Sequence, residues 1–162
     1  MFILTRDDGY QLSTDPARLD LDLVHHWLST DAYWAIGRDR ATVERAFDGS
    51  LAFGVYRPGD GGQVAVARVV TDRATFAWLC DVYVDRSVRG RGLGTWLAGA
   101  VRDHLAELGV RRIVLATNDA HGVYGKVGFT PVNPASWMEY DARVTPLTGK
   151  ESNGSGHLTV EA

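Results

Sequence analysis

The chain has 162 residues, 45% of them hydrophobic and 23% charged, which is the composition of an average globular protein. This length predicts one domain with its own hydrophobic core. The formal net charge of −3 gives no general attraction for nucleic acid. No apolar run approaches the roughly 18 residues of a membrane-spanning helix, and the first residues lack the order of a signal peptide. We therefore expect a cytoplasmic protein that binds neither nucleic acid nor a membrane.

Cysteine and histidine usage argues against metal and disulfide chemistry. Cys80 is the only cysteine, which excludes intramolecular disulfides and a multi-cysteine metal site. It lies in an apolar run, where a small buried hydrophobe is a better interpretation than a nucleophile. No pair of histidines has metal-ligand spacing with a third partner, so no metal is expected.

The first half of the chain is predicted to contain four short strands and two helices. An Asp-Gly pair in 6–9 suits a tight reversal between the first two strands, and helical spacing of apolar residues marks the first helix. The segment 31–37 is irregular and aromatic. In chain order, we expect strands at 2–5 and 10–13, helices over 21–28 and 42–47, and strands at 51–56 and 64–70 that pair antiparallel.

The second half is predicted to contain a strand-helix-strand unit over 76–116. Its first strand, 76–84, is the expected central strand, and the strand 113–116 follows a helical crossover. The helix between them has apolar residues at steps of three or four and a glycine stop. These are Leu93, Leu97, Val101, Leu105 and Leu108, followed by Gly109.

The C-terminal part is predicted to add smaller elements. A short helix is expected over 120–127, and one or two last strands over 129–140, interrupted by two prolines. The composition beyond residue 145 is polar and small, typical of a flexible tail. The expected organisation is a domain over 1–144 and a tail over 145–162.

The segment Arg89-Gly90-Arg91-Gly92-Leu93-Gly94 joins a strand end to a helix start. Backbone N–H groups and the helix dipole favour an anion there, and glycines permit close approach of a pyrophosphate. A P-loop needs Lys and Ser or Thr after the last glycine, and a dinucleotide fingerprint needs a glycine at position 95. The chain has Thr95 and Trp96 there, so neither motif fits.

The pattern Arg-x-x-Gly-x-Gly, after a strand ending Val82-Tyr83-Val84-Asp85, resembles the acetyl-CoA pyrophosphate loop of the GNAT superfamily. A second segment, from Asn118 through Ala120 and Tyr124 to Gly128-Phe129, resembles the family's Asn-x-x-Ala-x-x-hydrophobic-Tyr-x-x-x-Gly-Phe pattern, with a variant spacing. The likeness covers about residues 50–140. Its glycines at 122 and 125 predict a short or kinked helix.

The resemblance implies a mixed, mostly antiparallel sheet that splays around a cofactor cleft and is flanked by about four helices. It implies an N-acetyltransferase that uses acetyl-CoA, with Tyr124 as the general acid that protonates the coenzyme's sulfur. The cofactor-binding residues that it implies are Val82, Tyr83, Val84, Arg89, Gly90, Arg91, Gly92, Leu93, Gly94, Thr95 and Asn118. A packing tyrosine and a helix-capping asparagine are the alternatives for Tyr124 and Asn118.

The acceptor side is less defined by the sequence. Asp81 is the candidate general base or anchor for the substrate, although an ordinary satisfied strand aspartate and deprotonation through water stay open. Tyr33 and Trp34 are candidates for one wall of the acceptor site, with core packing as the alternative. Three acidic residues, Asp31, Asp81 and Asp85, favour a small cationic amine.

Two functions remain open on the sequence. One is acetylation of a primary amine of a small molecule or peptide, and the other is a catalytically silent relative that binds acetyl-CoA as a sensor or structural ligand. A phenol at position 124 favours the enzyme. A homodimer is a further expectation, with 137–140 as a candidate sheet edge.

Overall fold

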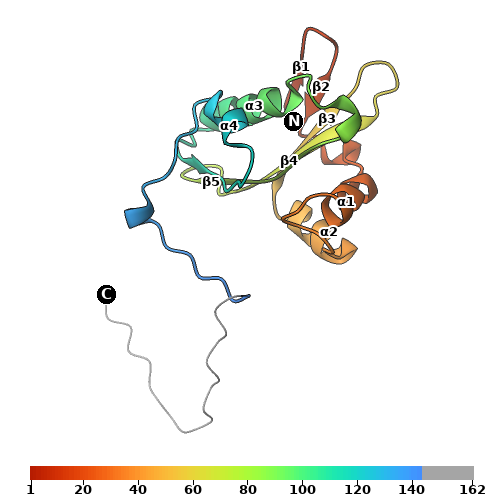
Figure 1. The fold of residues 1–162 in the computed structure, drawn as a ribbon. Coiled ribbons are helices and arrows are strands. Elements are labelled where there is room, and N and C mark those ends of the chain that lie inside the picture. Colours follow the sequence, from red (N-terminus) through yellow and green to blue (C-terminus); the bar gives the residue numbers. More distant parts are fainter. Residues whose placement is uncertain (144–162) are drawn as a thin grey trace. The chain divides into compact units, whose positions relative to one another are not determined.

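The computed structural model describes residues 1–143 and separates into two units, Met1–Thr130 and Pro131–Ala162. The predicted tail, 145–162, lies outside the described residues. All candidate site residues belong to the first unit, whose chain path is shown in Figure 1.

A six-stranded sheet is the framework of the first unit, with the strands in chain order β1-β2-β3-β4-β5-β6. The first five strands pair antiparallel with their neighbours, and β6 runs parallel to β5. This sheet and four α-helices confirm the predicted mixed fold class. The strands are β1 Ile3–Thr5, β2 Gln11–Ser13, β3 Leu51–Tyr56, β4 Gln63–Thr71, β5 Ala77–Val84 and β6 Ile113–Val114.

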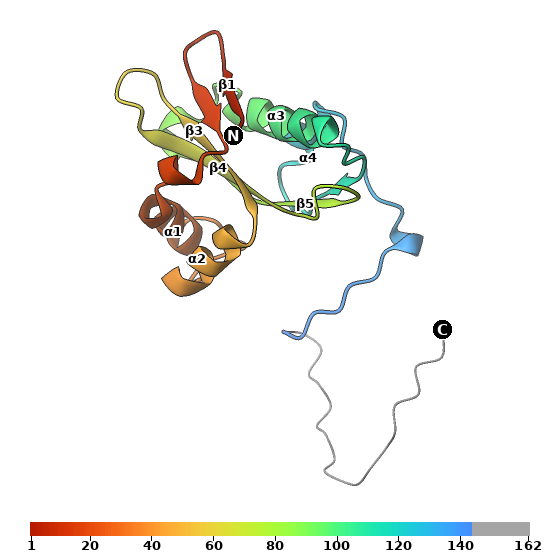
Figure 2. The same ribbon diagram turned by 180° about the vertical axis from the view of Figure 1, so that it is seen from behind.

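The helices cover the two faces of the sheet, as Figures 1 and 2 show from opposite sides. On one face lie α1 (Leu21–Thr30) and α2 (Arg40–Asp48), and on the other lie α3 (Leu93–Glu107) and α4 (His121–Gly125). Each face therefore has its own hydrophobic core, one between the sheet and α3 and one beneath α1 and α2. Aspartate side chains cap α1 and α2 by accepting backbone N–H groups in the first turn.

Helix α3 follows its predicted apolar face with one exception. Leu93, Leu97, Val101 and Leu105 are buried against the sheet, whereas Leu108 is 42% exposed. The difference arises because α3 ends at Glu107 and the chain then turns through a glycine with φ +87. The last leucine of the pattern thus stands outside the helix that would have buried it.

Strand β5 contains a bulge centred on Asp81, whose φ is +47. Arg68 of β4 pairs with Cys80 and Val66 pairs with Tyr83, so β5 has an extra residue in this stretch. The bulge changes the face that the buried side chains occupy, because Ala77 and Leu79 belong to the core beside α3 whereas Tyr83 belongs to the core beneath α1 and α2. Asp81 and Tyr83 are both buried, at 5% exposure. The bulge turns the carboxylate of Asp81 toward the side of the sheet that α1 and α2 cover.

The sheet opens beyond the first two residues of β5. Ala77 pairs with Ile113 and Trp78 with Val114, and the ladder between β5 and β6 ends there. From residue 79 to residue 84, β5 is paired on its β4 side alone among the described strands. This separation is the splaying that the fold class predicted, and it exposes one backbone edge of β5.

The strands expected over 129–140 are absent from the structure, and this prediction was wrong. Residues 131–143 of the second unit contain a single turn of 3-10 helix, η3 (Pro134–Ser136), capped by the side chain of Asn133. Two prolines remove backbone donors that a ladder needs. As a result β5 stands fifth of six strands instead of at the centre, and 137–140 forms no sheet edge.

The described residues also bear on membrane and metal binding. None of the helices within residues 1–143 is long and apolar enough to cross a membrane. Over the same range, no group of three His, Cys, Asp or Glu residues is arranged to hold a metal ion.

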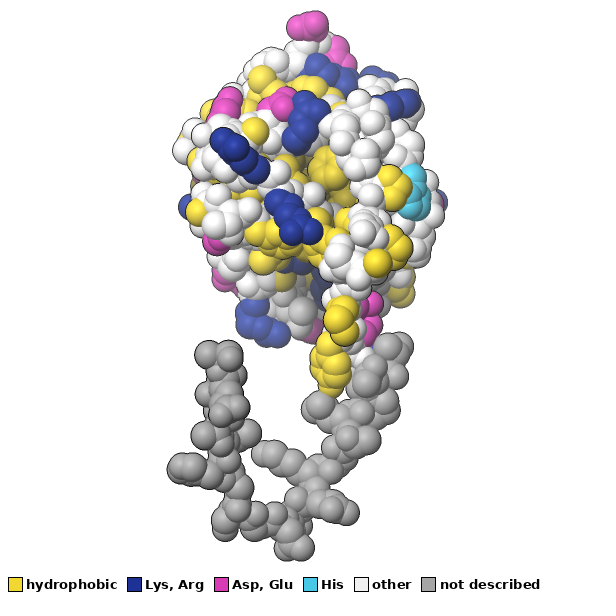
Figure 3. Space-filling model, turned by 90° about the vertical axis from the view of Figure 1, so that its left-hand side faces the viewer, with side chains coloured by type: hydrophobic (Ala, Val, Ile, Leu, Met, Phe, Trp, Pro, Cys, Tyr) yellow, Lys and Arg dark blue, Asp and Glu magenta, His cyan; other side chains and the backbone are white. Residues whose placement is uncertain are grey.

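Basic side chains gather on one face of the molecule. Although the formal net charge is −3, Figure 3 shows a face on which Lys and Arg side chains gather around hydrophobic ones.

Candidate active site

The glycine-rich turn lies between the end of β5 and the start of α3, after the 3-10 helix η2 (Arg86–Val88). Gly90 and Gly92 have φ of +81 and +74, and a Cβ atom built on either would meet nothing within 4 Å. The backbone is therefore open to a ligand at both positions. The predicted residues Arg89, Gly90, Arg91, Gly92, Leu93, Gly94 and Thr95 all belong to this turn and the first turn of α3.

The N-terminus of α3 has free donors. No side chain caps it, and its first helical hydrogen bond runs from the N–H of Trp96 to the carbonyl of Gly92. The three preceding N–H groups and the helix dipole favour an anion at this end of a 15-residue helix. A Cβ atom on Gly94 would lie 3.7 Å from Val84 and 3.8 Å from Val123, so this turn adjoins both β5 and α4.

Arg89 of this turn is linked to the end of α1 through Asp31. Its Nε donates to the carbonyl of Val84 at 2.9 Å and its Nη2 to Asp31 at 3.4 Å. Arg86 also donates twice to the same carboxylate, and the hydroxyl of Tyr83 donates at 2.7 Å. Hydrogen bonds from Arg86 and then Tyr83 lower the pKa of Asp31 to about 2. Asp31 is thus a charge partner of the arginines next to the glycine-rich turn.

Tyr124 lies in the short helix α4, which is five residues long as its glycines predicted. Its ring packs edge-on against Phe129 with centroids 5.9 Å apart and borders the α3 core. Burial raises the pKa of Tyr124 to about 12, so the phenol stays protonated at neutral pH. Within residues 1–143 its Oη has no hydrogen-bond partner, and it is not among the fully buried orphan atoms. That hydroxyl is available to a ligand.

The aromatic segment 31–37 approaches α4 from the opposite side of the opening. The Oη of Tyr33 accepts a hydrogen bond from the backbone N–H of Asn118 at 3.2 Å. Trp34 packs edge-on against Tyr33, with ring centroids 4.9 Å apart. Both side chains are partly open, at 49% and 40% exposure. The structure therefore brings the predicted acceptor wall next to the segment that contains Asn118 and leads to Tyr124.

Asp81 is held by three donors. Arg38 Nη1 donates to both carboxylate oxygens at 3.0 Å, Arg68 Nε donates at 2.7 Å, and the indole Nε1 of Trp34 donates at 3.1 Å. The carboxylate side chain is 2% exposed. Each oxygen thus accepts two hydrogen bonds from described side chains. Asp81 ties the acceptor wall to the bulge of β5.

Sequence reasoning missed Arg38 and Arg68 as functional candidates, and it did not pair Asp31 with any arginine. These partners are 13 to 58 positions apart in the chain, so no local motif signals them.

The interpretation of Cys80 agrees with its surroundings: burial raises the pKa of the thiol to about 11, which keeps it protonated and unreactive at neutral pH.

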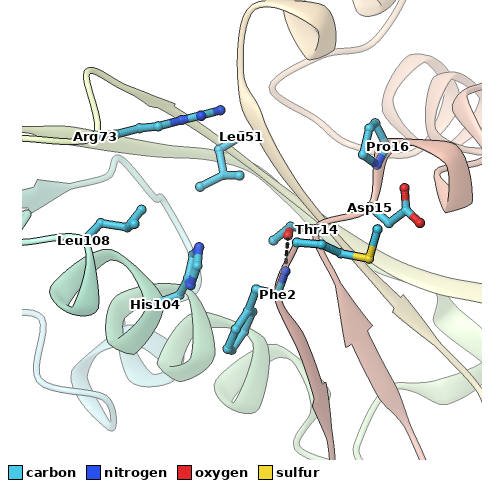
Figure 4. A pocket seen from close by; sticks show the side chains of 9 residues that line it. Phe2, Thr14, Asp15, Pro16, Leu51, Arg73, His104 and Leu108 are labelled. Carbon is cyan, nitrogen blue, oxygen red and sulfur yellow. Dashed lines mark hydrogen bonds between the residues drawn. The ribbon is translucent and has the colours of Figure 1, made fainter.

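A surface cavity of about 380 Å³ lies elsewhere in the first unit. Figure 4 shows its lining, where the ring of His104 stacks on Phe2 with centroids 4.5 Å apart. None of its lining residues belongs to the glycine-rich turn, the acceptor wall or α4. The predicted site residues therefore lie outside the lining of this cavity.

Comparisons with known proteins identify the family of this chain. The model of the acetyltransferase (GNAT) family matches residues 21–129. A Gibberella zeae protein provisionally named an acetyltransferase is 34% identical over 140 residues, 75% of this chain and 78% of that protein. A crystal structure assigned to the GNAT family, from Xanthomonas campestris pv. campestris, is 48% identical with a TM-score of 0.75, covering 82% of this chain and 93% of that one.

A more distant solved structure shares the fold alone. It is a Clostridium acetobutylicum protein, provisionally named an acetyltransferase and solved with acetyl-CoA, which is 17% identical with a TM-score of 0.64 and covers 83% of this chain and 96% of that one. The family match spans more than half of the chain and includes both the glycine-rich turn and Tyr124. The chain therefore belongs to the acetyltransferase (GNAT) family.

Proposed function

We propose that this protein transfers the acetyl group of acetyl-CoA directly to a primary amine of a small molecule or peptide. The observation that carries the proposal is the arrangement around the opening of the sheet. An uncapped helix start with open glycines lies at one end, and a protonated tyrosine hydroxyl without a protein partner lies on α4. The helix start is suited to bind an anion, and the tyrosine hydroxyl is suited to protonate a leaving group.

The fit to the cofactor rests on the backbone. The turn 89–95 would hold the pyrophosphate, because the N–H groups of residues 90–95 have no partner among the described residues and its glycines leave space. The unpaired edge of β5 at Val82, Tyr83 and Val84 would bind the amide groups of the pantetheine arm, and Asn118 lies across the opening. The acetyl-CoA-bound Clostridium structure with the same fold supports this choice of cofactor. Bound acetyl-CoA supplies an activated thioester.

Tyr124 is proposed as the general acid. When the acceptor nitrogen attacks the thioester carbon, a new C–N bond forms and the C–S bond breaks. The departing sulfur takes a proton from the hydroxyl of Tyr124, and the nitrogen loses one to water or a base. A phenol with a pKa of about 12 retains its proton over the whole range in which amines become neutral.

Asp81 is proposed to organise the acceptor side. All of its donors are side chains that are already in place, and removing a proton from the acceptor would require one of them to leave. It fixes Trp34 and Arg38 instead, and deprotonation of the amine through ordered water is compatible with this role. Tyr33 and Trp34 remain the proposed acceptor wall.

The test is a calorimetric titration with acetyl-CoA and with free CoA, followed by a thiol-release assay over a panel of amines. Micromolar binding of acetyl-CoA and CoA release that depends on an amine are expected. Binding without turnover of any amine would favour the silent relative. Absence of binding would overturn the proposal.

A further inference from the structure

The charges around the acceptor wall differ from what the sequence indicated. Its acidic residues favoured a cationic amine, yet all three carboxylates are occupied. Asp85 caps η2 through Ser87, and each of the other two faces a pair of arginines. These groups are Asp31 with Arg86 and Arg89, and Asp81 with Arg38 and Arg68. With one carboxylate and two guanidinium groups, the Asp81 cluster has a net positive charge, whereas Arg89 of the Asp31 cluster also interacts with Asp85.

The two arginines on Asp81 differ in how many donors they have left. Arg68 uses Nε on Asp81 and Nη1 on the hydroxyl of Ser50, and its side chain is 15% exposed. Arg38 uses Nη1 alone and is 24% exposed. Among the described residues, Nε and Nη2 of Arg38 find no acceptor, and neither is a fully buried orphan atom. One edge of its guanidinium group is therefore available.

The carboxylate of Asp81 connects Arg38 to the acceptor wall. Arg38 and the indole of Trp34 donate to the same oxygen of Asp81, at 3.0 and 3.1 Å. Trp34 packs on Tyr33, which bonds to Asn118 near α4. A chain of direct contacts thus runs from Arg38 past two half-exposed aromatic rings to the segment that leads to Tyr124. A small molecule on this wall would meet a cation at one end and the acyl-transfer residues at the other.

We infer that the acceptor carries an oxyanion, a carboxylate or a phosphate, in addition to its amine, and that the Nε–Nη2 edge of Arg38 binds it. A guanidinium fork matches the two oxygens of such a group, and charge-assisted bidentate pairs are the strong ones. The body of the acceptor lies on the rings of Tyr33 and Trp34. A polycationic acceptor would instead meet the net positive charge of the Asp81 cluster. The inference rests on the proposed function and specifies its acceptor class.

The experiment compares matched amines in the thiol-release assay. Amino acids are set against their amides, and amino-sugar phosphates against the free amino sugars, with a polyamine as the cationic arm. We expect kcat/KM to be at least about tenfold higher for the anionic member of one pair. The neutral member of that pair lacks one charged bidentate contact, which accounts for the difference. The pair that responds distinguishes a carboxylate from a phosphate.

Variants assign the preference to Arg38. In Arg38→Gln the ratio of kcat/KM between anionic and neutral members should fall toward one, while the Kd of acetyl-CoA stays unchanged. Arg38→Lys keeps a cation beside Asp81 but lacks the second edge of the fork, and it serves if the glutamine variant folds poorly. Arg40→Gln is the control, because Arg40 pairs with Asp22 and Glu44 outside this wall.

Several outcomes would overturn the inference. These are equal or lower kcat/KM for the anionic members, a preference for the polyamine, or an anionic preference that survives in Arg38→Gln. If acetyl-CoA binds but none of the amines is acetylated, the inference about the acceptor is also overturned, whereas the cofactor assignment still holds. A wild-type protein that does not bind acetyl-CoA is the separate result that overturns the proposed function itself.

Discussion

The hydroxyl of Tyr33 accepts a hydrogen bond from the backbone N–H of Asn118 at 3.2 Å, although the residues are 85 positions apart. The bond connects the segment after α1 to the segment between β6 and α4. These segments approach from the two sides of the place where β5 and β6 separate. The bond places the candidate acceptor wall beside the segment that leads to the candidate acid, Tyr124.

The glycine-rich turn can be tested by filling its open space. Gly92→Trp should reduce acetyl-CoA affinity by at least about a hundredfold, since the side chain would occupy the region where phosphates approach and φ is +74. Gly59→Trp is the matched control, because Gly59 also has positive φ, at +90, and open surroundings but lies in the β3–β4 turn. Calorimetry measures both. Equal affinities in the two variants would show that the turn holds no phosphate.

Tyr124→Phe tests the general acid. Removing the hydroxyl should lower kcat about a hundredfold or more, the usual contribution of a positioned acid, with little change in the Kd of acetyl-CoA. Because the pKa of Tyr124 is about 12, the wild-type rate should rise from pH 7 to 9 as the amine loses its proton, without a descending limb below pH 10. A wild-type rate that falls between pH 8 and 10, or full activity in the variant, would contradict the assignment.

Asp81→Asn separates a positioning residue from a base. Loss of the carboxylate leaves two guanidinium groups without their anion, so the free energy of unfolding should fall by about 3 kcal/mol. We expect KM for the amine to rise and the shape of the pH profile of kcat to persist. Loss of the acidic limb of that profile would instead identify a base. Asp22→Asn, an exposed partner of Arg40, should change stability by less than about 0.5 kcal/mol.

Asp31 predicts a pH dependence of stability. Its pKa is lowered from 3.8 to about 2 in the folded protein, so its contribution is complete above about pH 4 and is lost as the pH falls through 2. Urea midpoints of the wild type and Asp31→Asn should therefore differ at pH 7 and converge near pH 2. The difference should shrink in high salt, because Asp31 is only partly buried and its partner Arg86 is 73% exposed. A gap that is unchanged at pH 2 would show that the arginine contacts do not stabilise the fold.

Local patterns were sufficient for much of the fold. The spacing of leucines predicted α3, the Asp-Gly turn predicted the first hairpin, and glycines in 118–129 predicted a short α4. The glycine-rich turn could also be predicted, because positive φ, a strand end and a helix start all depend on residues that are adjacent in the chain. The one or two strands expected over 129–140 are absent, because two prolines remove donors from any ladder.

By itself, then, the sequence determined the order of the elements as far as α4, the family resemblance and the glycine-rich turn. Only the tertiary structure decided the electrostatics of the site. Positive φ at Asp81 turned its carboxylate onto Arg38 and Arg68, and packing of α1 against β5 brought Asp31 to Arg86. Counting acids along the chain favoured a cationic amine, whereas ion pairs between distant residues surround Asp81 with two arginines. The net charge around a site depends on which charged residues lie close together in space, and the order of residues in the chain does not specify this.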